Sequence, residues 1–303
     1  MLWLSTNHRN KSFFDISTMK LHHLNAAKGK KICGSSAGWL IMVDKTSHII
    51  SLIKPFNTAK IIQLKPSFFT KTKQPFHVHK VILSSDPELD PFYFSVLAIS
   101  GEKRQLAYYN ARTQTWTLLH AAGSSYDDLI SHNGKFYAVD EYGKICQIDY
   151  SNLSVRVVFD RWFFGGNKVY LVCKDGQLLV IFRYLKENPY FRYETYNFQV
   201  FMLNLEEQKY SRIGKFPEFA IFLGQNHSTW LAADDTKGVI GDSIYFTDDH
   251  HSNGLEHSVI DSHDAGLYDM EYSRVVPLQC CNRDRLLHVC SRPIWIMSDN
   301  IDR

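Results

Sequence analysis

The amino-acid sequence predicts an all-β protein folded as a six-bladed β-propeller. Runs of roughly four to eight apolar or aromatic residues recur along the chain with turn residues between them, and none has the period of an amphipathic helix. Aromatic residues, which favour strands, make up 14% of the chain. A unit of paired strands returns every roughly 40–50 residues, which is the spacing typical of four-stranded propeller blades.

Each repeat ends in an outer hairpin, in which two strands flank a short polar turn. In residues 105–119, for example, the strands QLAYYN and TWTLL flank the turn ARTQ. Alternating apolar and polar residues are the pattern of a strand with one buried face. The six outer hairpins cover residues 12–24, 49–64, 105–119, 144–158, 199–213 and 266–278.

Two inner strands precede each outer hairpin except the first. The five inner pairs are residues 31–33 with 39–43, 80–84 with 92–99, 129–131 with 135–139, 169–173 with 178–184, and 229–232 with 243–247. The hairpin at residues 12–24 has no room upstream for its pair, and apolar runs remain at residues 285–290 and 293–297. We therefore expect the two ends of the chain to share the last blade, which would close the ring and remove its free edges.

This assignment predicts a single domain with one binding face. Residues 12–299 form the propeller, between short tails at residues 1–11 and 300–303. In an up-and-down blade, the connection between the second and third strands shares a face with the connection between blades. The long segments belong to these two classes, and long loops on a rigid ring usually bind something. They are residues 65–79, 120–127, 160–166, 186–195 and 249–265.

The composition excludes several classes of protein. The 34 basic and 31 acidic residues give a net charge of +3, too balanced to indicate a nucleic-acid partner. No apolar run approaches the roughly 18 residues that span a bilayer, and residues 1–12 lack the apolar core of a signal peptide. The six cysteines have no disulfide-scaffold spacing. We expect a monomer in the cytoplasm, the nucleus or both, without a membrane partner.

One stretch, residues 33–44, fits a catalytic pattern. Gly34-x-Ser36-x-Gly38 has the spacing of the nucleophile elbow of serine hydrolases. An elbow needs a helix after the serine, whereas the apolar run at residues 39–43 has the pattern of a strand. The structural interpretation is that both glycines shape a turn between two inner strands, with the serines bonding local backbone. Trp39 and its alternate neighbours would then face one side of the strand, and Leu40 and Met42 the other.

Acidic residues offer a second catalytic hypothesis. Pairs occur at residues 127–128, 234–235 and 248–249, and carboxylate pairs serve glycoside hydrolysis. Adjacent residues in a strand point to opposite faces, and Asp at a strand end commonly caps a turn. We therefore interpret these pairs as turn caps. The His- and Asp-rich residues 248–264 match no defined metal spacing, so we expect neither a metal nor a cofactor.

Aromatic residues in two of the long segments are the candidates for protein binding. Trp, Tyr and Arg dominate the hot spots of protein interfaces. The alternative, that these side chains fill gaps between blades, stays open. The candidates are Trp162, Phe163, Tyr190, Phe191, Arg192 and Tyr193.

Three segments carry a resemblance to a known family. CGSSAGWL at residues 33–40, GDSIYFTDD at residues 241–249 and PIWI at residues 293–296 stand in the order typical of the plant F-box-associated KIB-type β-propellers. The sequence resembles this family over about residues 12–299. The resemblance implies a kelch-like propeller that recognises a protein and does not catalyse a reaction. In many members an F-box precedes the propeller and docks on the Skp1 subunit of a cullin-type ubiquitin ligase.

This chain departs from the family pattern at its N-terminus. An F-box needs roughly 40–50 helical residues, and only residues 1–11 precede the first expected strand. We expect Skp1 binding only if an F-box is missing from this gene model. The sequence thus predicts a protein-interaction propeller of the substrate-adaptor type. The alternative is an enzyme, either a serine hydrolase that uses Ser36 or a glycosidase that uses a carboxylate pair.

Overall fold

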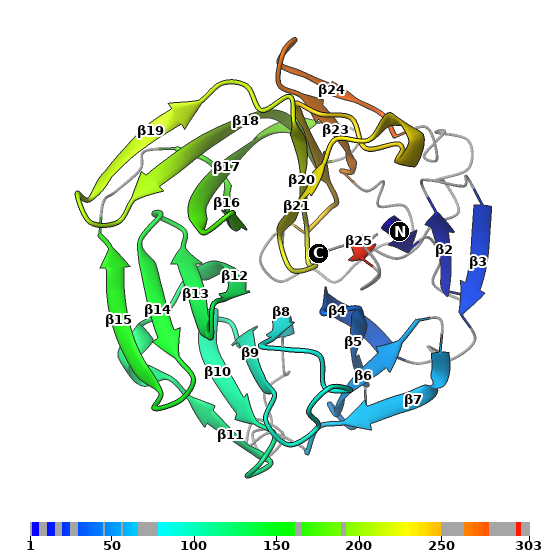
Figure 1. The fold of residues 1–303 in the computed structure, drawn as a ribbon, viewed down its shortest axis with the longest axis vertical. Helices are drawn as coiled ribbons and strands as arrows, with labels where there is room; N and C mark the ends of the chain where they lie inside the picture. The colour runs from blue at the N-terminus through cyan, green and yellow to red at the C-terminus, as the bar shows by residue number, and fades with distance from the viewer. Residues whose placement is uncertain are drawn as a thin grey trace.

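The computed structural model is an all-β propeller, as the sequence predicts. Its sheets are arranged around a common centre, and the chain visits them in order (Figure 1). In the part of the chain that the structure describes, no helix is long and apolar enough to cross a membrane. The described residues are 2–5, 11–15, 20–24, 30–44, 46–55, 57–65, 78–160, 165–188, 192–249, 264–278 and 295–297.

Four blades are four-stranded antiparallel meanders, and their inner pairs and outer hairpins follow the predicted order. Each blade begins with its innermost strand, so its sequence order is also its order from the centre outward. The first contains β4 (Lys30–Ser36), β5 (Trp39–Asp44), β6 (Ile50–Lys54) and β7 (Asn57–Gln63), and the second β8 (Val78–Leu83), β9 (Ser95–Ser100), β10 (Gln105–Asn110) and β11 (Thr115–Leu118). The third contains β12 (Tyr126–His132), β13 (Lys135–Asp140), β14 (Ile145–Asp149) and β15 (Ser154–Phe159), and the fourth β16 (Lys168–Lys174), β17 (Gln177–Asn188), β18 (Arg192–Asn204) and β19 (Lys209–Ile213).

The fifth blade differs from the prediction. It has five strands in the order β21 (Thr229–Ala232), β20 (Phe219–Leu223), β22 (Ser243–Phe246), β23 (Gly266–Asp269) and β24 (Arg274–Val276). The predicted direct pairing of residues 229–232 with 243–247 is wrong, because β20 lies between them and runs parallel to β22. A parallel pair requires a crossover, and residues 224–242 supply it with β21 and the short 3-10 helix η4 (Asp235–Lys237).

A further sheet contains strands from both ends of the chain. Its order is β25 (Trp295–Met297), β1 (Leu2–Ser5), β2 (Lys11–Asp15) and β3 (Lys20–Leu24), and β1 pairs antiparallel with β25. Strand β1 falls in the segment that the sequence predicts as a tail. Strand β1 also takes the second position in this sheet, where we expected a C-terminal strand. The other predicted strand, at residues 285–290, lies outside the described residues.

Trp295 connects this sheet to its neighbours on both sides. Its side chain is fully buried, and its ring packs edge-on against Phe222 and Tyr245 of the fifth blade. The indole Nε1 donates to the Leu223 carbonyl oxygen at 3.1 Å. On the other side, the Ser35 hydroxyl of the first blade donates to the Trp295 carbonyl oxygen.

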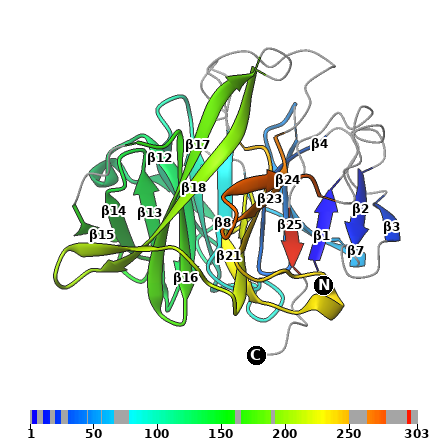
Figure 2. The same cartoon turned by 90° about the horizontal axis from the view of Figure 1, so that it is seen from above.

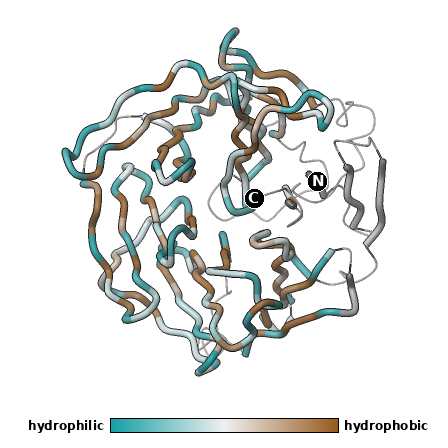
Figure 3. Tube along the Cα trace, viewed as in Figure 1, coloured by the Kyte–Doolittle hydropathy of each residue, from teal (hydrophilic) through white to brown (hydrophobic). Residues whose placement is uncertain are grey.

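The core lies between adjacent blades rather than in one central mass. Hydrophobic residues follow the strands, and the turns are mostly hydrophilic (Figure 3). Trp39, Ile41 and Val43 face the second blade, whereas Leu40 and Met42 pack with Ile296 on the other side. The predicted alternation of this strand is confirmed. Strand β5 is therefore apolar on both faces, because one face packs against the second blade and the other against the sheet that contains β25.

The β4–β5 hairpin explains the two glycines of the catalytic-looking motif. Ala37 and Gly38 form its two-residue turn with φ of 49° and 71°, a conformation that favours glycine. Gly34 lies at a β-bulge, and a Cβ there would stand 2.5 Å from the Val81 carbonyl oxygen of the next blade. Gly34 therefore allows close approach of two blades instead of shaping the turn.

The serines of this motif bond other blades, which corrects the prediction of local backbone bonds. Ser36 is buried, and its hydroxyl accepts the Leu83 N–H at 3.1 Å. Strand β5 follows the turn directly, where a nucleophile elbow would have a helix. Ser36 thus has neither the exposure nor the backbone setting of a hydrolase nucleophile.

Candidate functional site

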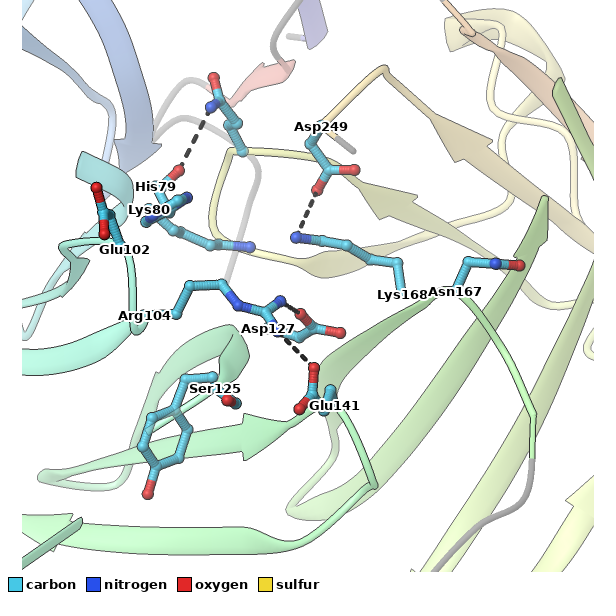
Figure 4. Close-up of a pocket in the computed structure, with 12 residues that line it drawn as sticks. His79, Lys80, Glu102, Arg104, Ser125, Asp127, Glu141, Asn167, Lys168 and Asp249 are labelled. Atoms are coloured by element: carbon cyan, nitrogen blue, oxygen red, sulfur yellow. Dashed lines mark hydrogen bonds and ion pairs between the residues drawn. The ribbon is translucent and has the colours of Figure 1, made fainter. Parts of the chain in front are cut away.

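A polar pocket of about 360 Å³ lies where the innermost strands of the second, third and fourth blades begin (Figure 4). These strand starts follow the long segments at residues 65–79, 120–127 and 160–166. The pocket therefore opens on the face that the sequence predicts for binding, here called the long-loop face. Its lining consists of His79, Lys80, Glu102, Arg104, Ser125, Tyr126, Asp127, Glu141, Asn167, Lys168, Gln225 and Asp249.

Residues 224–228, here called the plug, lie beside the pocket, and Gln225 of this segment contributes to its lining. This segment joins β20 to β21 and reaches the middle of the ring (Figure 1). The His227 N–H donates to the Ser35 carbonyl oxygen at 2.8 Å, and the His227 Nε2 accepts the Ser131 N–H at 3.0 Å. The Gln225 amide donates to the His79 carbonyl oxygen at 3.3 Å. The plug thus ties the fifth blade to the first three.

Asp127 and Asp128 at the start of β12 hold the third blade against the fourth. The Val169 N–H donates to Asp127 at 3.0 Å, and the Leu171 N–H donates to Asp128 at 2.9 Å. We predicted turn caps that point to opposite faces, and this is wrong for the pair. A β-bulge between Tyr126 and Asp128 interrupts the alternation, so both carboxylates reach the same neighbouring strand.

The buried cation of the pocket is Lys80, which forms an ion pair with Asp128. Its ammonium also donates to the Gly224 carbonyl oxygen at 3.1 Å and to the Ser228 hydroxyl at 3.2 Å. Burial lowers the pKa of Lys80, and the Asp128 carboxylate opposes that shift. Ser228 donates in turn to Asp128 at 2.7 Å, so the ion pair fixes the plug against the second and third blades.

A second set of ion pairs lies nearer the opening. Arg104 contacts Asp127 and also donates to Glu141 at 2.6 Å. Burial raises the pKa of Asp127, while the charges of Lys168 and Arg104 lower it. The Lys168 ammonium stands 3.8 Å from an Asp249 oxygen, beyond hydrogen-bond distance. These charged groups converge on one space (Figure 4).

Asp249 joins the pocket to a fully buried arginine, Arg183. The Arg183 guanidinium lies 3.2 Å from Asp249 and 2.9 Å from Asp264. It also donates to the Tyr170 hydroxyl at 3.1 Å, and that hydroxyl donates to Asp249 at 2.7 Å. A buried charge is stable only when it is paired and hydrogen-bonded, as here. Asp249 is therefore an ion-pair partner and not the turn cap that we predicted.

The remaining acid pair behaves as the sequence predicts. Asp234 caps η4, where its carboxylate accepts the Thr236 N–H at 3.0 Å. It lies away from the residues that line the pocket. The three acid pairs therefore have different roles, although their sequence contexts are similar.

Both histidines near the pocket are neutral at pH 7. Burial lowers the pKa of His79 to about 4, and its ring lies 2.9 Å from the Gly101 carbonyl oxygen. Burial and then the charge of Lys80 lower the pKa of His227 to about 4. The charge of the pocket thus comes from its lysine, arginine and carboxylate groups. Since Asp127, Glu141 and Asp249 are each held by a cation, the arrangement suits polar recognition better than proton transfer.

The predicted protein-binding residues are described only in part. Trp162, Phe163, Tyr190 and Phe191 lie outside the described residues. Arg192 begins β18, where its backbone pairs with Asn188. The Tyr193 side chain is half-buried, and its hydroxyl donates to Asp248 at 2.8 Å.

Arg192 and Tyr193 stand on a long hairpin and not in the loop that we expected at residues 186–195. Strands β17 and β18 stay paired out to Asn188 and Arg192. Lys168, at the start of β16, pairs with Arg183, so the rest of β17 extends past the pocket end of the blade. Figure 2 shows the two strands projecting beyond the body of the ring. The hairpin and the pocket therefore belong to the same face.

These features define a class: a β-propeller whose polar pocket and projecting hairpin share one face. The sequence model of the KIB1-4 β-propeller family matches residues 13–269. The chain belongs to the KIB1-4 β-propeller family.

The chain is also similar to named proteins and to a solved structure. The F-box protein SKIP23 of Arabidopsis thaliana is 22% identical over 80% of this chain and 70% of its own length. At5g55150, another Arabidopsis thaliana protein named for an F-box, is 26% identical over 72% of this chain and 62% of its own length. The solved Dos1 propeller has a TM-score of 0.45 and 12% identity, and the match covers 91% of this chain and 68% of that one.

Proposed function

We propose that this chain is the target-recognition propeller of an F-box-type ubiquitin ligase adaptor, and that it binds a protein without catalysing a reaction. Membership of the KIB1-4 family and the names of the relatives support the adaptor class. The pocket supports binding over catalysis, because Asp127, Glu141 and Asp249 are fixed in ion pairs. The single observation that carries the proposal is the shared face of the pocket and the projecting hairpin.

The target would be held across this face, with the hairpin as one wall and the pocket beside it. We assign the contact to Arg192 and Tyr193 on the hairpin, together with Trp162, Phe163, Tyr190 and Phe191. Tyr193 lies next to the outer end of the described hairpin, so its bond to Asp248 holds the projecting part in place and reduces the entropy lost on binding. Binding to Skp1 belongs only to a form of the protein that carries an F-box, and the site of action is the cytoplasm, the nucleus or both.

The proposal includes a sixth blade that closes the ring. The sheet β25-β1-β2-β3 would serve as this blade, supported by the contacts of Trp295 with the fifth blade and with Ser35 of the first. Closure by both ends of the chain would remove the free sheet edges and make the binding face rigid.

The test is a comparison of variants in affinity capture from plant cell extract. Glu102→Lys with Glu187→Lys changes the charge of exposed positions at the pocket and on the hairpin. Glu206→Lys with Glu271→Lys makes the same change in turns at the opposite ends of the strands. We expect proteins captured by the unchanged chain to be lost with the first variant and kept with the second. If the first variant captures the same proteins as the unchanged chain, the proposal is overturned.

A further inference from the structure

Three large apolar side chains are exposed together on one loop of the second blade. Leu89, Phe92 and Tyr93 are 80%, 65% and 66% exposed, and all lie between β8 and β9. This trio is here called the knob. Scattered apolar residues are normal on a protein surface, but a cluster that includes aromatics marks an interaction site.

The loop that carries the knob is held in one conformation. Asp86 at its start accepts from the Trp39 indole at 2.6 Å, from the Lys54 ammonium at 3.1 Å and from the Glu88 N–H at 2.8 Å. Lys54 also pairs with Glu88 at 2.9 Å. Asp90 accepts the Phe92 N–H at 3.3 Å. A preordered loop loses little entropy on binding, so its exposed side chains are suited to a protein contact.

The knob lies at the end of the ring away from the pocket. Strand β8 begins beside the pocket, where His79 and Lys80 line it, and ends at Leu83. The β8–β9 loop is therefore on the opposite face. A partner on the knob leaves the long-loop face open, so this inference does not rest on the proposed function.

The charges around the knob indicate which partner would fit it. Asp86 and Glu88 are matched by Lys54 and Lys60 of the first blade. Asp90 has no ion pair among the described residues. Arg112 stacks over the Tyr93 ring at 5.7 Å and has no ion pair among them either.

One free charge of each sign beside an apolar trio makes the patch complementary to itself. Under a two-fold axis, the acid of each copy meets the base of the other while the apolar side chains pack together. A partner of one charge sign would leave one of these two groups unmatched.

We propose that the occupant of this patch is a second copy of the chain. The two knobs bury each other, and Asp90 of each copy pairs with Arg112 of the other. Three side chains bury less than the roughly 800 Å² per partner of a standard interface, so the dimer is weak, with a dissociation constant on the order of tens of micromolar. This proposal differs from the sequence-based expectation of a monomer. The dimer would present two long-loop faces outward, which favours bivalent binding.

The primary measurement is sedimentation velocity over a concentration series up to roughly 200 μM, about tenfold above the expected dissociation constant. We expect the sedimentation coefficient to rise with concentration. The triple variant Leu89→Ser, Phe92→Ser, Tyr93→Ser should stay monomeric with an unchanged melting temperature, because all three side chains are exposed. Tyr272→Ser is the matched control, since Tyr272 is 67% exposed on a different blade, and it should dimerise normally.

Charge reversal tests the pairing itself. Asp90→Arg alone and Arg112→Asp alone should each weaken self-association at least tenfold, because like charges then face each other. An equal mixture of the two variants should recover association, since each then supplies the charge that the other lacks. A chain that stays monomeric throughout the series overturns the proposal. The same holds if the monomeric chain instead sediments with phosphatidylcholine–phosphatidylserine vesicles, which would indicate a membrane partner. Self-association that neither the knob variant nor the charge variants weaken overturns the proposal as well.

Discussion

Asp128→Asn is the substitution that tests most sharply how the centre of the ring is held together. The Asp128 side chain is fully buried and the Lys80 side chain is 5% exposed. Asp128 also accepts the Leu171 N–H and the Ser228 hydroxyl, so it joins the third blade to the fourth and to the plug. The asparagine keeps the size of the side chain but leaves the Lys80 ammonium buried without its counter-ion.

The cost follows from the burial of that charge. Removing one partner of a buried ion pair destabilises a protein by about 3–5 kcal/mol, a large part of the roughly 5–15 kcal/mol that holds a domain folded. Deprotonation of Lys80 limits the loss, since burial already lowers its pKa. We therefore expect Asp128→Asn to lower the free energy of unfolding by about 3 kcal/mol at pH 7.

Urea denaturation followed by tryptophan fluorescence measures this loss. Asp175→Asn is the control, because Asp175 pairs with Lys174 at an exposed site and should change stability by less than about 0.5 kcal/mol. Adding Lys80→Met to Asp128→Asn should recover part of the loss by removing the buried charge. Equal midpoints for Asp128→Asn and Asp175→Asn would refute the reasoning, as would a double variant less stable than Asp128→Asn alone.

Three other predictions concern separate parts of the ring. Gly34→Ala should lower the free energy of unfolding by about 2 kcal/mol or more, because the added Cβ meets the backbone of the next blade. Gly214→Ala, which has open space around it, should be nearly neutral in the same urea assay. Equal losses for the two variants would contradict this prediction. His227 is neutral in both states above pH 6.5, and between pH 6.5 and about 4 only the unfolded chain gains its proton, so unfolding free energy should fall by about 2 kcal/mol from pH 6.5 to 5. The pKa of His79 is lowered to about 4 as well and adds a comparable fall over the same range, so His227→Gln should remove only the share of about 2 kcal/mol that belongs to His227. An identical pH dependence in both proteins would contradict the assignment. Trp295→Ala should cost about 3–5 kcal/mol in thermal or urea unfolding if β25 belongs to the ring, and a loss under about 1 kcal/mol would argue against closure.

The sequence predicts those parts of the fold that depend on local patterns. Alternation along residues 39–43 places Trp39 and Ile41 on one side and Leu40 on the other, because strand geometry alone determines which side a residue faces. The antiparallel meanders of the first four blades follow for the same reason. Local alternation cannot reveal a β-bulge, so the orientation of Asp127 and Asp128 was predicted wrongly.

The site depends on contacts between residues far apart in the chain, and these leave little local signal. Lys80, Arg104 and Lys168 meet at the pocket only because three blades begin there. The sequence of the plug has the pattern of an ordinary polar turn between two apolar runs. Nothing in that pattern indicates that the plug forms hydrogen bonds with three other blades. The inner pairs that the sequence predicts do not include β20, because its parallel pairing with β22 requires a crossover that local alternation does not indicate. The long segments did indicate the correct face for the pocket.

Hydrogen–deuterium exchange of the chain with a purified target is the most direct test of target recognition on the long-loop face. The account predicts that the target slows exchange at the ends of β17 and β18 near Asn188 and Arg192, and at the pocket residues near Lys168. Exchange in the turn between β18 and β19, at the other end of the blade, should stay unchanged. Protection confined to that turn and to the β8–β9 loop would contradict the account.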